Sequence, residues 1–259
     1  MANLYIHHHM GLGDMIHLNG MVRKLLKDHN DYNTISVFSK NCYKEMTEWM
    51  YRDEPRIDVI GIDENGVERH LVDQVLTKKL IGTDDKFLRV GHEYYRDQCN
   101  ENGPMPCDMI FYNQINMPYS CRFDDCYWER DMEEENRVYN KLAPKDQDYI
   151  FVHDDPNRKE VSGGFVIRDD QTNSNLAIVR NDMDESIFHL GMLLENAKEV
   201  HVMESSIRCM VEFLKPGLLE NGVKLYFHNF RGGPSYNEET KKWNGTNLPF
   251  ELVNESAMT

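Results

Sequence analysis

The stretch that decides the fold runs Asn3-Leu4-Tyr5-Ile6-His7-His8-His9-Met10-Gly11-Leu12-Gly13-Asp14. Its first five residues predict a β-strand, and the two glycines that follow end it. Asp14 stands in a position suited to cap a helix. Beyond it, Met15, Leu18 and Val22 recur at helical spacing on one face. A strand, a glycine turn and an amphipathic helix in this order are typical of a layered α/β protein.

The same alternation of β-type runs and helical patterns continues along the chain and predicts parallel strands. In the first half we expect strands over 34–38 and 58–62, weaker strands over 86–90 and 108–112, and a helix over 133–142. In the second half we expect strands over 148–153, 163–167, 176–179, 199–203 and 223–228, and helices over 186–197 and 207–214. The stretch 113–130 has no clear period, so a long loop is expected there.

A proline-containing segment separates the two halves. Pro144 stops the preceding helix, and polar residues follow it, as in a linker. The sequence therefore predicts an N-terminal α/β domain over 1–143, a C-terminal α/β domain over 148–230 and an irregular tail over 231–259.

Composition excludes several classes of protein. The chain has 259 residues with 29 Lys+Arg against 44 Asp+Glu, a net charge of −15 that disfavours general nucleic-acid or membrane-surface binding. Hydrophobic residues at 40% exclude global disorder. Mean hydropathy of −0.65 and the lack of a long apolar run exclude a transmembrane segment. The N-terminus does not resemble a signal peptide and the six cysteines form no CxxC pair, so we expect a cytoplasmic protein with reduced thiols.

The turn at Gly11 and Gly13 has two interpretations. Glycines let a ligand approach the backbone, and the helix start beyond them offers free N–H groups. However, a dinucleotide fingerprint needs a third glycine, and a phosphate-binding P-loop needs Gly-Lys-Ser/Thr, and both are missing. Taken alone, the motif fits a ligand site or a purely structural turn.

A second turn, Met203-Glu204-Ser205-Ser206-Ile207-Arg208, also lies between a predicted strand and a predicted helix. Ser205 and Ser206 offer donors to a diphosphate at the helix start, with Arg208 as its charge partner. The alternative is a serine that only caps the helix, with Glu204 on the rim.

The two turns together, in this order along the chain, resemble the heptosyltransferase-like branch of the GT-B glycosyltransferases. In that family a G-L-G-D turn opens the N-terminal acceptor domain, and a D-S/T-G-type turn in the C-terminal domain holds the donor's diphosphate. The resemblance implies two Rossmann-like domains that face each other across a cleft. It also implies transfer of a sugar from a nucleotide-diphosphate donor to a glycan hydroxyl, without a metal or further cofactor.

The sequence departs from the family pattern, so no particular donor sugar is implied. Glu204 stands where the family usually has Asp, Ser206 where it often has Gly, Cys209 where a His commonly follows, and Gly20 where a Pro is frequent.

The resemblance suggests roles for individual residues. Asp14 is the expected base that takes the proton from the acceptor hydroxyl, although a helix N-terminus favours its charged form and so weakens it as a base. The alternative for Asp14 is a plain helix cap. Donor contacts are expected from the two turns and from residues near strand ends in the second half: Gly11, Gly13, His153, Arg158, Arg168, Arg180, Glu204, Ser205, Ser206 and Arg208. Each arginine could instead be a solvated surface charge.

Acceptor contacts are expected from the end of the first strand and from the aromatic loop. Aromatic faces flanked by hydrogen-bonding groups suit sugars. The candidates are His8, His9, Gln114, Tyr119, Arg122 and Trp128. The alternative is that these aromatics pack the loop onto the domain. No metal site is predicted, because successive histidines on a strand alternate faces.

Three other functions stay open. The same fold hosts epimerases of nucleotide sugars, and a catalytically silent nucleotide- or glycan-binding protein would also fit. A Rossmann oxidoreductase is disfavoured because the third glycine is absent.

Overall fold

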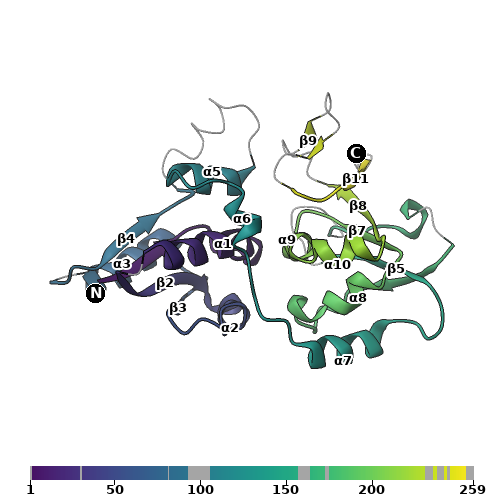
Figure 1. Ribbon diagram of the computed structural model, residues 1–259, viewed down its shortest axis with the longest axis horizontal. Helices are drawn as coiled ribbons and strands as arrows, with labels where there is room; N and C mark the ends of the chain where they lie inside the picture. Colours follow the sequence, from purple (N-terminus) through teal and green to yellow (C-terminus); the bar gives the residue numbers. More distant parts are fainter. Residues whose placement is uncertain are drawn as a thin grey trace. The chain divides into compact units, whose positions relative to one another are not determined.

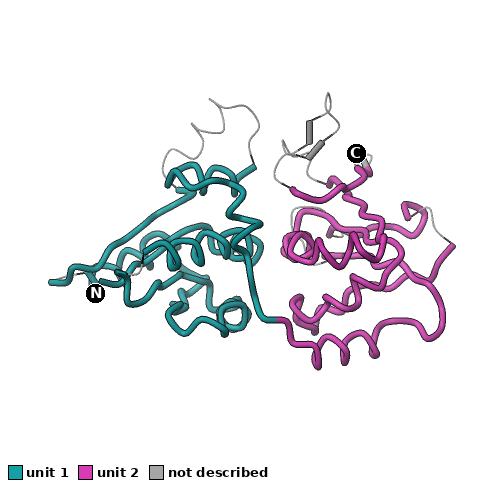
Figure 2. The backbone as a smooth tube through the Cα atoms, in the orientation of Figure 1, with its two compact units in different colours: residues 1–129 teal, residues 130–259 magenta. Residues whose placement is uncertain are grey.

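The computed structural model describes residues 2–29, 31–80, 82–92, 106–156, 164–172, 175–230, 236–237, 242–243 and 246–254. The chain folds into two compact units, residues 1–129 and residues 130–259 (Figure 2). Each unit contains its own parallel sheet flanked by helices (Figure 1). The predicted α/β class with parallel strands is therefore confirmed.

The first unit has a four-stranded sheet in the order β3-β2-β1-β4, with every strand pair parallel. Strands β2 and β4 lie on opposite sides of β1, so the topology switches at β1, where ligands of open α/β sheets bind. The elements are β1 (Ala2–His7), α1 (Leu12–Asp28), β2 (Tyr32–Lys40), α2 (Asn41–Met50), β3 (Ile57–Ile62), α3 (Glu68–Leu80), β4 (Lys86–Arg89), α5 (Cys107–Gln114) and α6 (Cys121–Asp124).

Two apolar clusters hold the first unit together. One joins Tyr5 of β1 and Phe38 of β2 to Val72 and Leu76 of α3. The other joins α1 to α5 and α6 through residues that include Leu18, Met21, Phe111, Tyr112 and Cys121. Both clusters consist of buried side chains, which is the main source of the unit's stability.

Helix α1 approaches α6 closely at Gly20. A Cβ added there would overlap the carbonyl oxygen of Cys121. Any side chain at this position, including the proline frequent in the resembling family, would push the two helices apart.

The predicted strand over 108–112 is wrong, because these residues form helix α5. A short apolar run cannot be distinguished from a buried helix by periodicity alone. Pro106 occupies the N-cap and Asp108 lies in the first turn, where its charge suits the helix dipole. The predicted long loop over 113–130 also contains the short helix α6.

The second unit has a five-stranded parallel sheet in the order β11-β8-β7-β5-β6. Its switch point lies between β5 and β7, which lie side by side. The elements are α7 (Met132–Leu142), β5 (Tyr149–Val152), η1 (Asp169–Gln171), β6 (Ala177–Arg180), η2 (Ile187–His189), α8 (Gly191–Glu195), β7 (Glu199–Val202), α9 (Ser206–Phe213), α10 (Lys215–Glu220), β8 (Lys224–Asn229), the pair β9 (Tyr236–Asn237) and β10 (Lys242–Trp243), and β11 (Glu251–Asn254).

Three expectations for the second half need correction. Residues 164–167 form no strand and make only an isolated bridge, between Asp155 and Phe165. The helix expected over 186–197 is divided into η2 and α8, because the Met192 N–H bonds to Glu135 Oε2 at 2.7 Å and not to a backbone carbonyl one turn earlier. The tail is not wholly irregular, since β11 extends the sheet beside β8.

Helix α7 packs on α8 and η2, so it belongs to the second unit. Arg130 fixes this arrangement: its guanidinium donates to Glu135 at 2.7 Å and to Glu195 at 2.8 Å. The division between units therefore falls before Arg130, whereas the proline segment at 143–146 lies inside the second unit. A linker-like composition does not reveal which side a neighbouring helix packs on.

Candidate active site

The turn after β1 is built around Gly11, which is the N-cap of α1. Asp14 lies in the first turn of the helix and is not the cap itself. Its carboxylate accepts a hydrogen bond from the Gly11 N–H, which satisfies one of the free donors at the helix start. A Cβ on Gly11 would lie 2.8 Å from Asp14 Oδ2. Glycine is thus required for the carboxylate to turn back onto the backbone.

The surroundings of Asp14 raise the pKa of its carboxyl group. Burial is the largest cause, and the nearby carboxylates of Asp108 and Glu68 add to it, while His9 and the Gly11 N–H oppose it. The effect of the helix N-terminus on basicity, noted from the sequence, is therefore outweighed by the protein's own burial. Asp14 is still half-exposed, so a substrate can reach it. A raised pKa suits a general base.

Two predicted acceptor residues contact Gly91, and one of them, His9, also acts on the charge of Asp14. His9 Nε2 donates to the Gly91 carbonyl at 2.6 Å, and Gln114 Oε1 accepts from the Gly91 N–H at 2.7 Å. Gly91 follows β4, so these contacts join the ends of β1, β4 and α5 at the switch point of the first sheet. His9 and Gln114 are both half-buried.

Three of the predicted acceptor contacts are wrong. His8 is fully buried and its Nδ1 donates to the His9 carbonyl; Arg122 and Trp128 are buried as well. Arg122 forms a buried ion pair with Asp108 at 2.8 Å. For these residues the alternative holds, namely packing and pairing inside the unit. Tyr119 is half-buried and its hydroxyl donates to Asp108 at 2.6 Å, so it supports the same ion pair.

Among the described residues, two groups of potential metal ligands were not predicted from the sequence. One consists of His7, Glu68 and His92, and the other of Asp14, His17 and Cys107; within each group the ligand atoms lie within 4.8 Å of one another. Each group joins distant segments, so most of its members had no common signal in the sequence. The spacing of three residues between Asp14 and His17 on α1 was the one available hint.

The turn after β7 is a capped helix start. Ser205 is the N-cap of α9, and its hydroxyl accepts from the Arg208 N–H at 3.3 Å. The Cys209 thiol donates to the Ser205 carbonyl, also at 3.3 Å, so this cysteine has a local structural role. Glu204 and Ser206 flank the cap and are half-exposed. The capping alternative is thus confirmed for Ser205.

The described arginines of the predicted donor site are all paired with carboxylates. Arg208 bonds to Glu212 at 2.9 Å, and the exposed Arg168 bonds to Asp170 at 3.1 Å. Arg180 contacts Asp154 and also bonds to Asp169 at 2.6 Å. Carboxylates therefore offset the local positive charge that these arginines were expected to supply. Arg158 lies outside the described residues.

His153 follows β5, and Glu204 follows β7, so both lie at the switch point of the second sheet. His153 is buried and its Nδ1 donates to Asn181 Oδ1 at 3.2 Å. The structure thus brings His153 and the Ser205 turn to the same edge of one sheet, and their contact with a donor stays a prediction.

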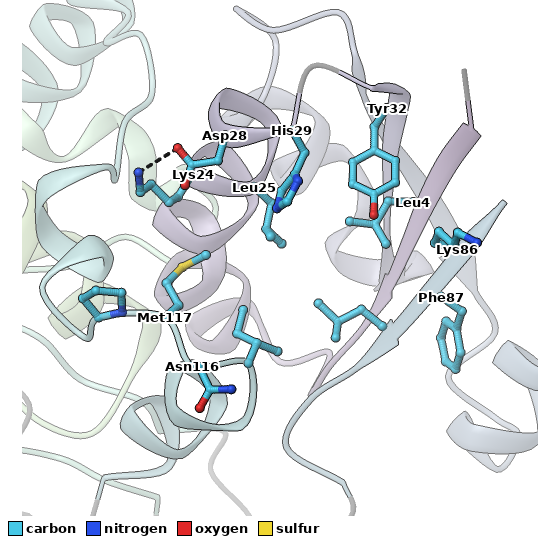
Figure 3. Close-up of a pocket in the computed structure, with 13 residues that line it drawn as sticks. Leu4, Lys24, Leu25, Asp28, His29, Tyr32, Lys86, Phe87, Asn116 and Met117 are labelled. Atoms are coloured by element: carbon cyan, nitrogen blue, oxygen red, sulfur yellow. Dashed lines mark hydrogen bonds and ion pairs between the residues drawn. The ribbon is translucent and has the colours of Figure 1, made fainter.

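A hollow of about 500 Å³ lies elsewhere on the first unit (Figure 3). Leu4, Leu25 and Met117 contribute apolar side chains to it, and Lys24 and Asp28 form an ion pair of 2.8 Å on its wall. These residues lie toward the C-terminal end of α1, about 15 Å from Asp14 by the helical rise. The hollow is therefore separate from Asp14, although its wall includes Ile115 and Pro118, the sequence neighbours of Gln114 and Tyr119.

None of the helices among the described residues combines the length and apolarity needed to cross a membrane. The fold is similar to that of two solved glycosyltransferases. A family 9 glycosyl transferase from Veillonella parvula DSM 2008 matches with a TM-score of 0.56 and 10% identity, over 100% of this chain and 88% of that one. The E. coli ADP-heptose LPS heptosyltransferase II matches with a TM-score of 0.53 and 12% identity, over 98% and 90%. No family model and no curated sequence matches the chain.

These likenesses confirm the resemblance at the level of the fold. The chain has the fold of the heptosyltransferase-like glycosyltransferases.

Proposed function

We propose that the protein is a glycosyltransferase that moves a sugar from a nucleotide-diphosphate donor to a glycan hydroxyl. The observation that carries the proposal is Asp14, a half-exposed carboxylate with a raised pKa at the switch point of the first sheet. It lies in a fold shared with glycosyltransferases. A sugar hydroxyl attacks poorly unless it loses its proton during the reaction, and Asp14 would accept that proton.

The reaction then forms one bond and breaks another. The acceptor oxygen bonds to the anomeric carbon while the bond from that carbon to the diphosphate breaks, and the proton passes to Asp14. His9 and Gln114, held at Gly91, would orient the acceptor. Positioning of this kind supplies a large part of the rate enhancement in enzymes.

The second unit would hold the donor. The start of α9 presents backbone N–H groups and the positive end of the helix dipole, which favour a diphosphate, although Ser205 Oγ already accepts the Arg208 N–H. Glu204, Ser206 and His153 lie at the same sheet edge. Arg180 and Arg208 would have to exchange a carboxylate for a phosphate. The proposal includes that the leaving group departs without a metal or other cofactor.

The proposal also includes that the Gly11 and Ser205 turns act on one substrate pair, so that the two units face each other across a cleft, as in GT-B enzymes. Donor binding should then depend on residues of the second unit, whereas transfer should need residues of both units.

A silent binding protein is the second candidate, and the carboxylate-paired arginines favour it. Cations already paired would give the departing diphosphate less stabilisation during transfer. Such a protein would bind a nucleotide or glycan but show no turnover.

One experiment separates the two candidates. Thermal shifts with UDP, GDP, ADP, CMP and dTDP identify the nucleotide, because a ligand of the native state raises its stability. Release of that nucleotide from its sugar conjugates is then measured with glycan acceptors. We expect Asp14→Asn to lose transfer by at least about 100-fold while keeping nucleotide binding.

Asp28→Asn is the matched control, since it removes a carboxylate at the other end of α1. Full transfer activity in Asp14→Asn would show that Asp14 is not the base. Nucleotide binding without any transfer would identify the silent protein.

A further inference from the structure

A mixed set of ligand atoms surrounds the start of α1. The Asp14 carboxylate, a ring nitrogen of His17 and the Cys107 thiol all lie within 4.8 Å of one another. Asp14 and His17 are three residues apart on α1 and so share a face. Cys107 is the first residue of α5, which packs on α1.

Oxygen, nitrogen and sulfur ligands in one group are the set that zinc binds in proteins. Zinc bonds of about 2.0–2.3 Å in a tetrahedron place neighbouring ligands roughly 3.3–3.8 Å apart. The observed group, with atoms up to 4.8 Å apart, therefore needs to contract by at most about 1.5 Å. Three protein ligands would leave the fourth position open to water or a substrate oxygen.

The other three-ligand group is less suited to a cation. Arg89 Nε donates to His7 Nδ1 at 2.9 Å, so the proton of the neutral ring lies on Nε2, which a metal would need free. The positive charges of Arg89 and Arg69 also act on both His7 and His92. Nearby carboxylates do not separate the two groups, because Glu68 is a ligand of the other group and Asp108 is paired with Arg122. The hydrogen bond from Arg89 to His7 is what disfavours the other group.

We propose that Asp14, His17 and Cys107 form a binding site for a zinc-class divalent ion, and that the bound ion inhibits the enzyme by occupying the carboxylate of the base. The inhibition rests on the proposed transferase function, but the metal binding does not. The proposed reaction uses no metal, so we assign this site a regulatory role.

Cobalt(II) is the probe for binding, because a thiolate ligand gives cobalt a charge-transfer band that oxygen and nitrogen ligands do not give. Titration of the full chain with Co²⁺ should produce this band together with the visible bands of a four-coordinate ion. Zn²⁺ should displace the cobalt. Cys107→Ser should lose the band, and His17→Gln should weaken zinc binding by more than about 100-fold, since loss of outer partners alone costs 10–100-fold.

Cys42→Ser is the matched control, since Cys42 is an exposed thiol on α2 and is not a member of this group. It should keep the band. A wild-type titration without the band, or a band that survives Cys107→Ser, would overturn the site. Unchanged far-ultraviolet circular dichroism in the variants separates loss of a ligand from loss of the fold.

The inhibition has its own readout. Zn²⁺ should lower the transfer rate of the wild type at least tenfold. In Cys107→Ser the rates with and without Zn²⁺ should be nearly equal. If the cobalt band appears but no transfer is ever detected, the site stands and the proposed function fails. If transfer is detected and zinc leaves the wild-type rate unchanged, the inhibitory role is wrong.

Discussion

The Asp14 carboxylate accepts the Gly11 N–H, and the position of a Cβ on Gly11 lies only 2.8 Å from Asp14 Oδ2. The glycine and the carboxylate therefore fit only together. Gly11→Ala should displace the carboxylate while leaving the buried face of α1 unchanged. We expect transfer to fall by about 100-fold, the typical effect of a 1 Å misplacement, with nucleotide binding retained. Steady-state rates and thermal shifts measure the two effects, and an unchanged rate would contradict the role of this turn.

The raised pKa of Asp14 predicts the acid limb of the rate profile. A base must be deprotonated to act, so activity should fall on acidification at a pH above the ordinary value of about 3.9 for aspartate. Because His9 lowers the pKa of Asp14, His9→Gln should move this limb to higher pH. The measurement is kcat/KM against pH. A limb at or below the ordinary value would rule out a base of raised pKa at Asp14.

Buried histidines predict acid instability. Burial lowers the pKa of His8 to about 3, and burial followed by the neighbouring His228 lowers that of His201 to about 3. Between about pH 3 and 6.5 the unfolded chain binds protons that the folded chain does not, so stability is complete above 6.5 and is lost as the pH falls below it. Below pH 6.5 each of these histidines lowers the free energy of unfolding by about 1 kcal/mol for every pH unit of acidification. The free energy of unfolding, measured with urea at several pH values from 5 to 7.5, should depend less steeply on pH in His201→Gln than in the wild type.

Glu135 predicts how strongly α7 is attached. It is buried and binds both Arg130 and the Met192 N–H. Glu135→Ala would leave these donors without a partner and should lower the free energy of unfolding by about 3 kcal/mol. The exposed Glu133→Ala on the same helix is the control and should change it by less than about 0.5 kcal/mol. Equal effects of the two substitutions would show that α7 is only loosely held.

Local patterns predicted most of the strands and both turns, because strand runs and glycine turns are encoded over a few residues. Helices α2 and α3 were not predicted. Helix α5 was mistaken for a strand, because its buried residues form a short run without a helical period. In the site, Asp14 and Ser205 could be found from their turns. The partners of Arg122 and Arg180 could not, since Asp108 and Asp154 are brought to them by tertiary packing.

The carboxylates that pair with Arg180 and Arg208 affect how fast any anionic ligand binds to the second unit. Neutralised cations exert little long-range attraction, and a net charge of −15 repels anions at a distance. Association would then be slow compared with electrostatically steered encounters, and added salt would speed it by screening the repulsion. The protein would then distinguish such ligands by the short-range contacts that they make once bound, and not by long-range attraction.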